Sequence, residues 1–178
     1  MKTADYLDQL LRIYSGTFDI YQPYVIQGKE YPAYGYFSSH TEKYVLVREI
    51  NMWSSDSYEH VLFIETEEVD QGLIDEAYRI VTDYMEPVLV RKGEPLPSAG
   101  HMYSYMTISL VVQKPLSKEM QKAVKRFKYE QGYRFNMRGF SQAHIVCATM
   151  EDEKVYTNYV GRMSSKLYKS IFQKTLIE

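Results

Sequence analysis

Residues 103–113 read YSYMTISLVVQ, and this stretch decides the fold. It is the most continuous run of β-branched and aromatic residues in the chain. Turn-forming residues bound it, with Pro95, Pro97 and Gly100 before it and Pro115 after it. A run of this kind predicts a strand that is buried on both faces, in the middle of a sheet.

Helical patterns stand on both sides of this strand in the sequence. Apolar residues at helical spacing predict one helix over 69 to 84 or 85 and another over 116–131. Thr66 or Asp70 can cap the first helix, and Ser117 can cap the second. We expect Pro87 to end the first, because the residue before a proline is pushed out of the helical region.

The N-terminal part predicts a helix and then an antiparallel meander. The helix covers 3–14 with Thr3 as its cap, and a short strand follows within 17–21. Pro23 and Pro32 favour edge strands or loops around them, since each removes a backbone donor. The meander is read as a strand at 33–37, a turn at 39–42, a strand at 42–50, a polar loop at 51–57 and a strand at 58–67.

The C-terminal part predicts a strand over 139–150, a hairpin turn at 151–154, a strand over 155–161 and a last helix over 164–173. The element order is therefore α-β-β-β-α-β-α-β-β-α. We expect an α+β fold in a single globular domain spanning residues 1–178, with a mixed sheet of about five to seven strands flanked by three to four helices.

The amino-acid composition limits which class of protein the chain can belong to. The chain has 178 residues, 45% of them hydrophobic and 25% charged, which is typical of globular proteins with a real core. Its formal net charge of −2 does not by itself imply nucleic-acid or membrane binding.

The compartment is inferred from what the sequence lacks. The single cysteine, Cys147, excludes an internal disulfide and stands in an apolar run as a small buried hydrophobe. His144 is the only base near it, and three residues apart in a strand the two side chains face opposite sides. No signal peptide and no membrane-length apolar run is present. We expect a cytoplasmic protein of bacterial type.

Tyrosine is unusually frequent, with 18 residues. Seven of them fall close together in the N-terminal part: Tyr14, Tyr21, Tyr24, Tyr31, Tyr34, Tyr36 and Tyr44. Tyrosine has a large apolar body and a polar tip. The cluster is either a partly solvated sheet face or a contact surface for a partner subunit or a stacking ligand.

Basic charge is concentrated between residues 114 and 138. This window holds eight basic residues against two acidic ones. The candidate polyanion-binding residues are Lys118, Lys122, Lys125, Arg126, Lys128, Arg134 and Arg138. Aromatic residues lie between them, and such a combination can hold a phosphodiester backbone and stack bases. The alternative is a solvated helix face.

Acidic residues gather around the strand over 58–67. Asp56, Glu65 and Glu67 could together hold Mg²⁺, which prefers oxygen ligands. The element order is similar to that of the restriction-endonuclease-like fold, in which an Asp and a Glu-x-Lys bind metal and activate water. Here Glu65-Thr66-Glu67 has no lysine in third place. The alternative is an acidic strand end before a helix N-terminus.

The four histidines form no metal-binding motif, but His60 and His101 stand near the starts of two strands that we expect to be neighbours. They are close in space if those strands are parallel. No phosphate-binding loop, dinucleotide fingerprint or nucleophile elbow is present.

The sequence does not determine the function. We favour a non-enzymatic binding module that needs no cofactor, self-associates, and contacts nucleic acid or another polyanion through its basic helix. One alternative is a metal-dependent nuclease-like enzyme using Asp56, Glu65, Glu67 and Mg²⁺. Another is a protein–protein interaction module whose basic helix docks on an acidic protein.

Overall fold

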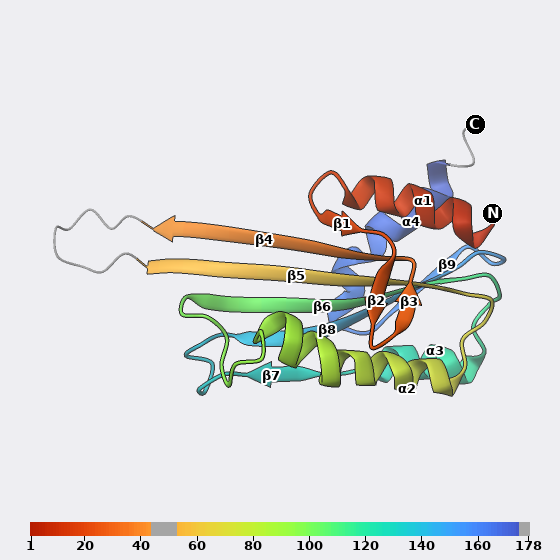
Figure 1. Ribbon diagram of the computed structural model, residues 1–178. Helices are drawn as coiled ribbons and strands as arrows, with labels where there is room; N and C mark the ends of the chain where they lie inside the picture. The colour runs from red at the N-terminus through yellow and green to blue at the C-terminus, as the bar shows by residue number, and fades with distance from the viewer. Residues whose placement is uncertain (44–52, 175–178) are drawn as a thin grey trace.

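A computed structural model describes residues 1–43 and 53–174, and a mixed sheet of seven strands runs through it (Figure 1). The hydrogen-bonded order is β1-β4-β5-β6-β8-β7, and β9 also pairs with β8. The strands are β1 (Asp19–Tyr21), β4 (Ala33–Lys43), β5 (Trp53–Thr66), β6 (His101–Val112), β7 (Glu130–Gly132), β8 (Phe140–Thr149) and β9 (Lys154–Thr157).

Strand β6 is the central strand, as predicted. It pairs in parallel with β5 on one side and with β8 on the other. Met106, Ile108 and Leu110 are completely buried on one face of it, and Val111 on the other. Both faces are apolar because helices cover both.

Two layers of helices enclose the sheet (Figure 1). One face carries α1 (Thr3–Tyr14) and α4 (Ser165–Lys174), which follows a short 3₁₀ helix, η2 (Val160–Ser164). The other face carries α2 (Gln71–Ile80), a π-helix η1 (Val81–Val90) and α3 (Lys118–Arg126). A separate hairpin of β2 (Tyr24–Ile26) and β3 (Lys29–Tyr31) lies beside this second layer. The predicted α+β class with a mixed sheet is confirmed.

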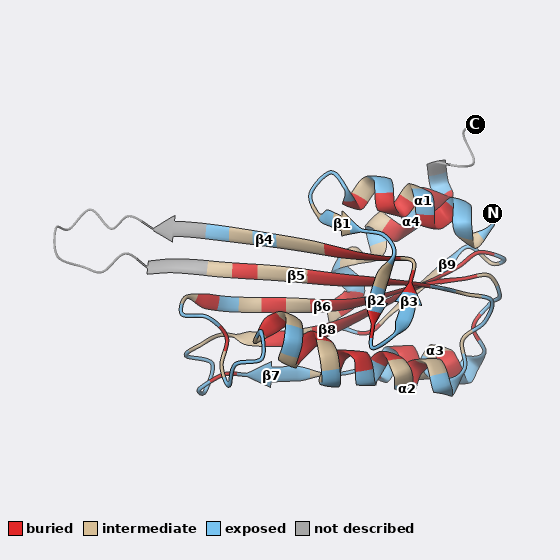
Figure 2. Cartoon of the chain, viewed as in Figure 1, coloured by how far each residue is buried: buried red, intermediate tan, exposed pale blue. Residues whose placement is uncertain are grey.

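Residue alternation along the strands divides the core in two. Leu62, Ile108 and Ile145 pack toward α2 and α3, whereas Val61 and Val146 pack toward α1 and α4. Buried residues therefore lie along the middle of the sheet and on the inner sides of the helices (Figure 2). Among the described residues, no helix is long and apolar enough to cross a membrane.

Two predicted caps are confirmed and one is wrong. The Asp70 side chain accepts from the Leu73 N–H at 2.8 Å, and the Ser117 hydroxyl accepts from the Met120 N–H at 3.1 Å. At α1 the N-cap is Lys2, with no side-chain cap. Thr3 lies within the helix, and its hydroxyl donates to Glu65 instead.

Pro87 does not end the second helix, contrary to the prediction. The helix continues from α2 into η1, and Pro87 lies inside it. In an α-helix a proline ring clashes with the carbonyl four residues before it, and the wider turn of a π-helix removes that close approach.

Helix α3 is shorter than predicted. It ends at Arg126 because Phe127 has an extended backbone, with ψ of 120°. Beyond it the chain pairs with the open edge of β8, where the Ala143 N–H donates to the Tyr129 carbonyl at 2.9 Å. Residues 130–132 then form β7 rather than the last turn of a helix.

The predicted turn at 39–42 is wrong, and so is most of the predicted loop at 51–57. Both segments belong to the long hairpin of β4 and β5, whose register runs from Ala33↔Phe63 to Lys43↔Trp53. The strand predicted at 42–50 lies outside the described residues except for its first two. The two strands extend past the rest of the sheet, and their backbone ladder continues along this extension (Figure 1).

Candidate functional site: a tyrosine-walled pocket

A cavity of about 980 Å³ opens on the α2 side of the sheet, near the starts of β5 and β6. Strands β4, β5 and β6 form one wall, and residues 88–98, which lead from η1 to β6, form another. Five tyrosines line it: Tyr21, Tyr24, Tyr34, Tyr36 and Tyr58. Most of the clustered tyrosines thus face this cavity or the core.

Strand register sets the tyrosines on one face. Tyr36 pairs with His60 across β4 and β5. Tyr34 lies two residues before Tyr36 on β4, and Tyr58 lies two residues before His60 on β5. Because side chains alternate between faces, these four point the same way. Tyr24 enters from the small hairpin and stacks on Tyr34, with ring centroids 4.4 Å apart.

His60 is a neutral polar group in this wall. It is 3% exposed, and its Nδ1 lies 2.7 Å from the Tyr34 hydroxyl. Burial, with smaller contributions from the charges of Lys92 and His101, lowers the pKa of His60 to about 4. The imidazole is therefore uncharged at neutral pH and offers one acceptor and one donor.

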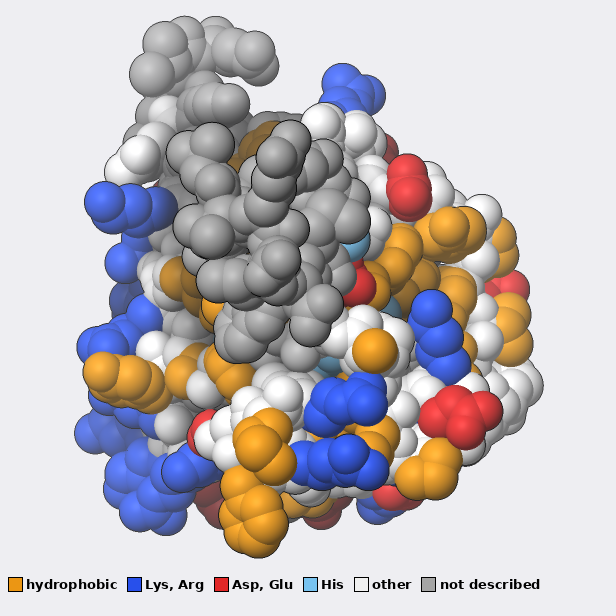
Figure 3. Space-filling view, turned by 90° about the vertical axis from the view of Figure 1, so that its left-hand side faces the viewer, with side chains coloured by type: hydrophobic (Ala, Val, Ile, Leu, Met, Phe, Trp, Pro, Cys, Tyr) orange, Lys and Arg blue, Asp and Glu red, His pale blue; other side chains and the backbone are white. Residues whose placement is uncertain are grey.

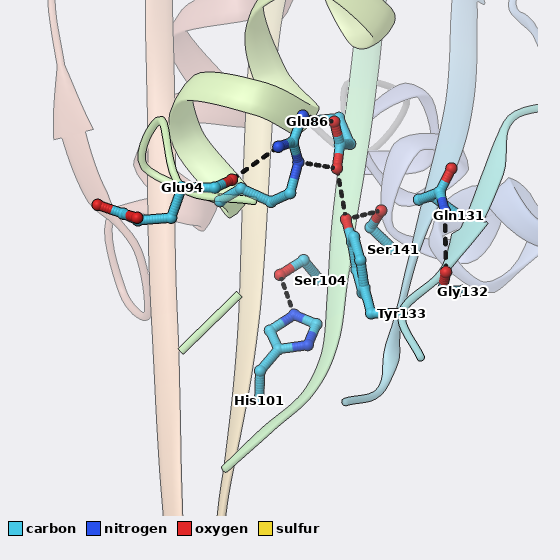
Figure 4. Close-up of polar contacts among 9 residues, drawn as sticks. Glu86, Glu94, His101, Ser104, Gln131, Gly132, Tyr133 and Ser141 are labelled. Atoms are coloured by element: carbon cyan, nitrogen blue, oxygen red, sulfur yellow. Dashed lines mark hydrogen bonds and ion pairs between the residues drawn. The ribbon is translucent and has the colours of Figure 1, made fainter. Parts of the chain in front are cut away.

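His101 lies four residues away from His60 along the paired strands, because the register sets it opposite Asp56 and sets His60 opposite Met106. Its Nε2 lies 2.8 Å from the Ser104 hydroxyl (Figure 4). Its Nδ1 lies 2.9 Å from the Arg138 carbonyl oxygen. A carbonyl only accepts, so Nδ1 carries the proton and Nε2 accepts from Ser104. Burial lowers the pKa of His101, and its ring stacks on Tyr58.

A buried ionic network fixes the rim of the cavity (Figure 4). Glu86, only 5% exposed, accepts from Arg91 Nε at 2.7 Å and from the Tyr133 hydroxyl at 2.8 Å. Tyr133 in turn accepts from Ser141 at 2.8 Å. Arg91 also donates to the Glu94 backbone carbonyl at 2.6 Å. This hydrogen bond connects the cavity-lining segment around Glu94 to the network. The ion pair raises the pKa of Arg91.

The structure places the basic residues of 114–138 in two separate regions. Five of its candidate residues are exposed on α3 or just after it: Lys118, Lys122, Lys125, Arg126 and Lys128. Arg134 and Arg138 lie instead in the loop between β7 and β8. Arg134 lines the tyrosine-walled pocket, and the Arg138 backbone contacts His101.

The three candidate metal-binding carboxylates do not converge. Asp56 pairs with His40 across the long hairpin, whereas Glu65 accepts from Thr3 at 2.5 Å. Asp56 and Glu65 stand nine residues apart on one extended strand, a span of about 30 Å. Glu67 follows the end of that strand. Within residues 1–43 and 53–174, no group of three His, Cys, Asp or Glu side chains is placed to hold a metal ion.

Cys147 and His144 face opposite sides of β8, as predicted. Cys147 is completely buried in the core toward α2 and α3, and burial raises the pKa of its thiol. It does not line the pocket.

Part of the pocket was readable from the sequence and part was not. The alternation of Tyr34 with Tyr36 and of Tyr58 with His60 places them on one face once the strands are assigned. The turn-forming Pro95, Pro97 and Gly100 indicated only where the central strand begins, so the contribution of Arg91 and its neighbours was missed. The signal there is a run of three charged residues, at 91, 92 and 94, beside a proline pair.

Comparison with known proteins gives one family. A family model described as "Domain of unknown function (DUF8052)" matches residues 2–170. No curated protein and no solved structure matches the chain.

Proposed function

The chain belongs to the DUF8052 family, whose description states no activity, and from the pocket we propose that the protein is a binding module for a small planar ligand. The observation that carries this proposal is the cavity of about 980 Å³, with five tyrosines and an uncharged histidine in its walls. Pockets of this size lie near the upper end of those that hold small molecules.

Tyrosine walls suit a flat ring for two reasons. An aromatic face stacks on the face of a planar ligand, and each such contact contributes about 1 to 3 kcal/mol. The hydroxyls stay protonated at neutral pH, because burial raises the pKa of Tyr24, Tyr34 and Tyr58. Uncharged hydroxyls and the neutral His60 then provide hydrogen bonds on the wall that the strands form, and the charged residues of the lining lie outside that wall.

The test is calorimetric titration of the protein with adenosine, an uncharged planar probe, and with ribose, which has no flat ring. We expect adenosine to bind and ribose not to bind. Replacing Tyr36 or Tyr58 by Ala removes a stacking wall and should weaken adenosine binding about tenfold or more.

The matched control is Tyr78→Ala. Tyr78 is 43% exposed on α2 and lies outside this cavity, so its loss should leave adenosine binding unchanged. Equal weakening by Tyr78→Ala and Tyr58→Ala, or no heat with adenosine, would count against the pocket as the site.

A second candidate function is polyanion binding by α3, which could engage nucleic acid. None of the five cations on or just after α3 forms an ion pair with another described residue. A groove of about 510 Å³ lies beside Lys125 and Lys128 and also contains Tyr129 and Tyr159. Unpaired cations beside aromatic rings support contact with a phosphodiester chain.

Other parts of the proposal rest on the sequence alone. We propose a cytoplasmic location, a bacterial source and self-association. An acidic protein as the partner of α3, in place of nucleic acid, is the remaining alternative.

A further inference from the structure

Two cations at the tyrosine-walled pocket have an unusual backbone. Lys92 has φ of 54° and Arg134 has φ of 48°, both in the left-handed region. Residues with a Cβ enter this region at a cost in free energy, and glycine does not. Such strained positions gather at ligand clamps, where the rest of the fold holds them.

The same two side chains are available to a ligand. Both are exposed, and both line the cavity. They come from segments far apart in the sequence, one before β6 and the other after β7. Neither forms an ion pair with another described residue, whereas Arg91 beside them is held by Glu86.

The pocket carries a net positive charge. Lys92 lies in its lining with the neutral His60, and its charge adds to the effect of burial in lowering the pKa of His60. The lining residues include three cations, Arg91, Lys92 and Arg134, and one carboxylate, Glu94. Viewed from the hairpin end, Lys and Arg side chains stand among hydrophobic ones on the surface (Figure 3).

We infer that the ligand of this pocket is a nucleotide, whose base stacks on the tyrosines and whose phosphate binds Lys92 and Arg134. This inference rests on the proposed function and names its ligand class. Arginine and lysine are the usual phosphate-binding side chains. A cavity of about 980 Å³ is larger than a single ring with an acid group needs, and it leaves room for a sugar between base and phosphate.

The experiment compares three probes by calorimetry: AMP, adenosine and ribose 5-phosphate. We expect AMP to bind at least about tenfold more tightly than adenosine, and ribose 5-phosphate to bind more weakly than AMP. Lys92→Gly and Arg134→Gly should each reduce AMP affinity to near that of adenosine. Adenosine affinity should not change in either variant.

Glycine is the chosen replacement because it adopts positive φ freely. The variants should therefore fold at least as well as the wild type, and thermal unfolding checks this. Gln27→Gly is the matched control, since Gln27 has φ of 49° in the β2–β3 turn and does not line this cavity. It should relieve the same strain and leave AMP binding unchanged.

The outcomes separate the two claims. Equal affinities for AMP and adenosine overturn the nucleotide inference and leave the planar-ligand proposal standing. AMP binding that survives both glycine variants also overturns the inference. Absence of binding by both probes overturns the inference and the proposed function together.

Discussion

Two buried histidines make stability depend on pH at the scale of single residues. Burial lowers the pKa of His60 and of His144 to about 4, from an ordinary value of 6.5. The unfolded chain takes up protons near pH 6.5, and the folded chain takes them up only near pH 4. The stabilisation is therefore complete above pH 6.5 and is lost as the pH falls toward 4.

Each histidine should change the unfolding free energy by up to about 3 kcal/mol across this range. The measurement is urea unfolding at several pH values from 7 to 4.5. The fall in stability should be smaller in His60→Gln and in His144→Gln than in the wild type. An unchanged pH dependence in both variants would contradict the assignment of neutral buried imidazoles.

Asn158 completes the edge of the sheet. It lies where β8 has no partner strand, between β7 and β9, and is 2% exposed. Its side chain accepts from the Ile145 N–H at 3.2 Å and donates to the Ala143 and Phe127 carbonyls, each at 3.0 Å. The amide thus makes hydrogen bonds that a neighbouring strand would make.

Asn158→Ala should destabilise the fold by about 2 to 4 kcal/mol, because it leaves several buried backbone groups unpaired. Asn158→Asp should also destabilise, since a carboxylate cannot donate to the two carbonyls. Chemical denaturation measures both, with the exposed Lys169→Ala as a control. A loss below about 1 kcal/mol for Asn158→Ala would show that water replaces the amide.

Only some of the residues whose side chains stabilise the fold could be identified from the sequence. The Asp70 and Ser117 caps were predicted because a cap depends on local sequence. The roles of Glu86 and Asn158 were not, because most of their partners lie 13 to 47 residues away along the chain. Nothing near either residue in the sequence marks these contacts.

At the scale of elements, α3 carries the polyanion proposal. Its cations should give an affinity for single-stranded DNA that falls steeply as salt rises from about 50 to 200 mM. Lys122→Glu with Lys125→Glu should abolish this binding, measured by fluorescence anisotropy of a labelled oligonucleotide. Lys169→Glu, an exposed change on α4, is the matched charge control.

Absence of binding at low salt would remove nucleic acid as the partner of α3. An acidic protein would then remain as the alternative for this face. Loss of binding by Lys169→Glu to the same extent would instead indicate a general charge effect.

The predicted ends of elements are wrong where tertiary contacts outweigh the conformational preference of the local sequence. Ser39 and Thr41 suggest a turn, yet each pairs with a residue of β5 in a long ladder. Pro87 suggests a helix end, yet the chain widens into a π-helix and continues. The periodicity of apolar residues predicted which helices and strands form, because burial against the sheet depends on that periodicity.

At the scale of the whole molecule, the mixed sheet was predicted and the direction of its central strands was left open. The helix between β5 and β6 belongs to a crossover, and these two strands are parallel. The pocket needs this arrangement together with the β4–β5 register, so its residues converge only in the folded chain. The clustering of the pocket's tyrosines was visible in the sequence, and the shape of the pocket was not.

Self-association is a prediction for the whole molecule. Tyr14, Tyr31 and Tyr34 are buried, and Tyr21 is 49% exposed, so only part of the tyrosine cluster is left for a partner copy. Light scattering after size exclusion should give twice the chain mass of 21.0 kDa. A mass of one chain at every concentration would contradict self-association.

The pocket is the central claim, and ¹H–¹⁵N correlation spectra of the ¹⁵N-labelled protein with adenosine test it most directly. Saturating adenosine should shift the amides of residues 34–36, 58–60, 91–94, 96 and 98, which surround the cavity, and leave those of α4 in place. Shifts confined to other residues, or no shifts at all, would contradict a planar ligand site between these tyrosines.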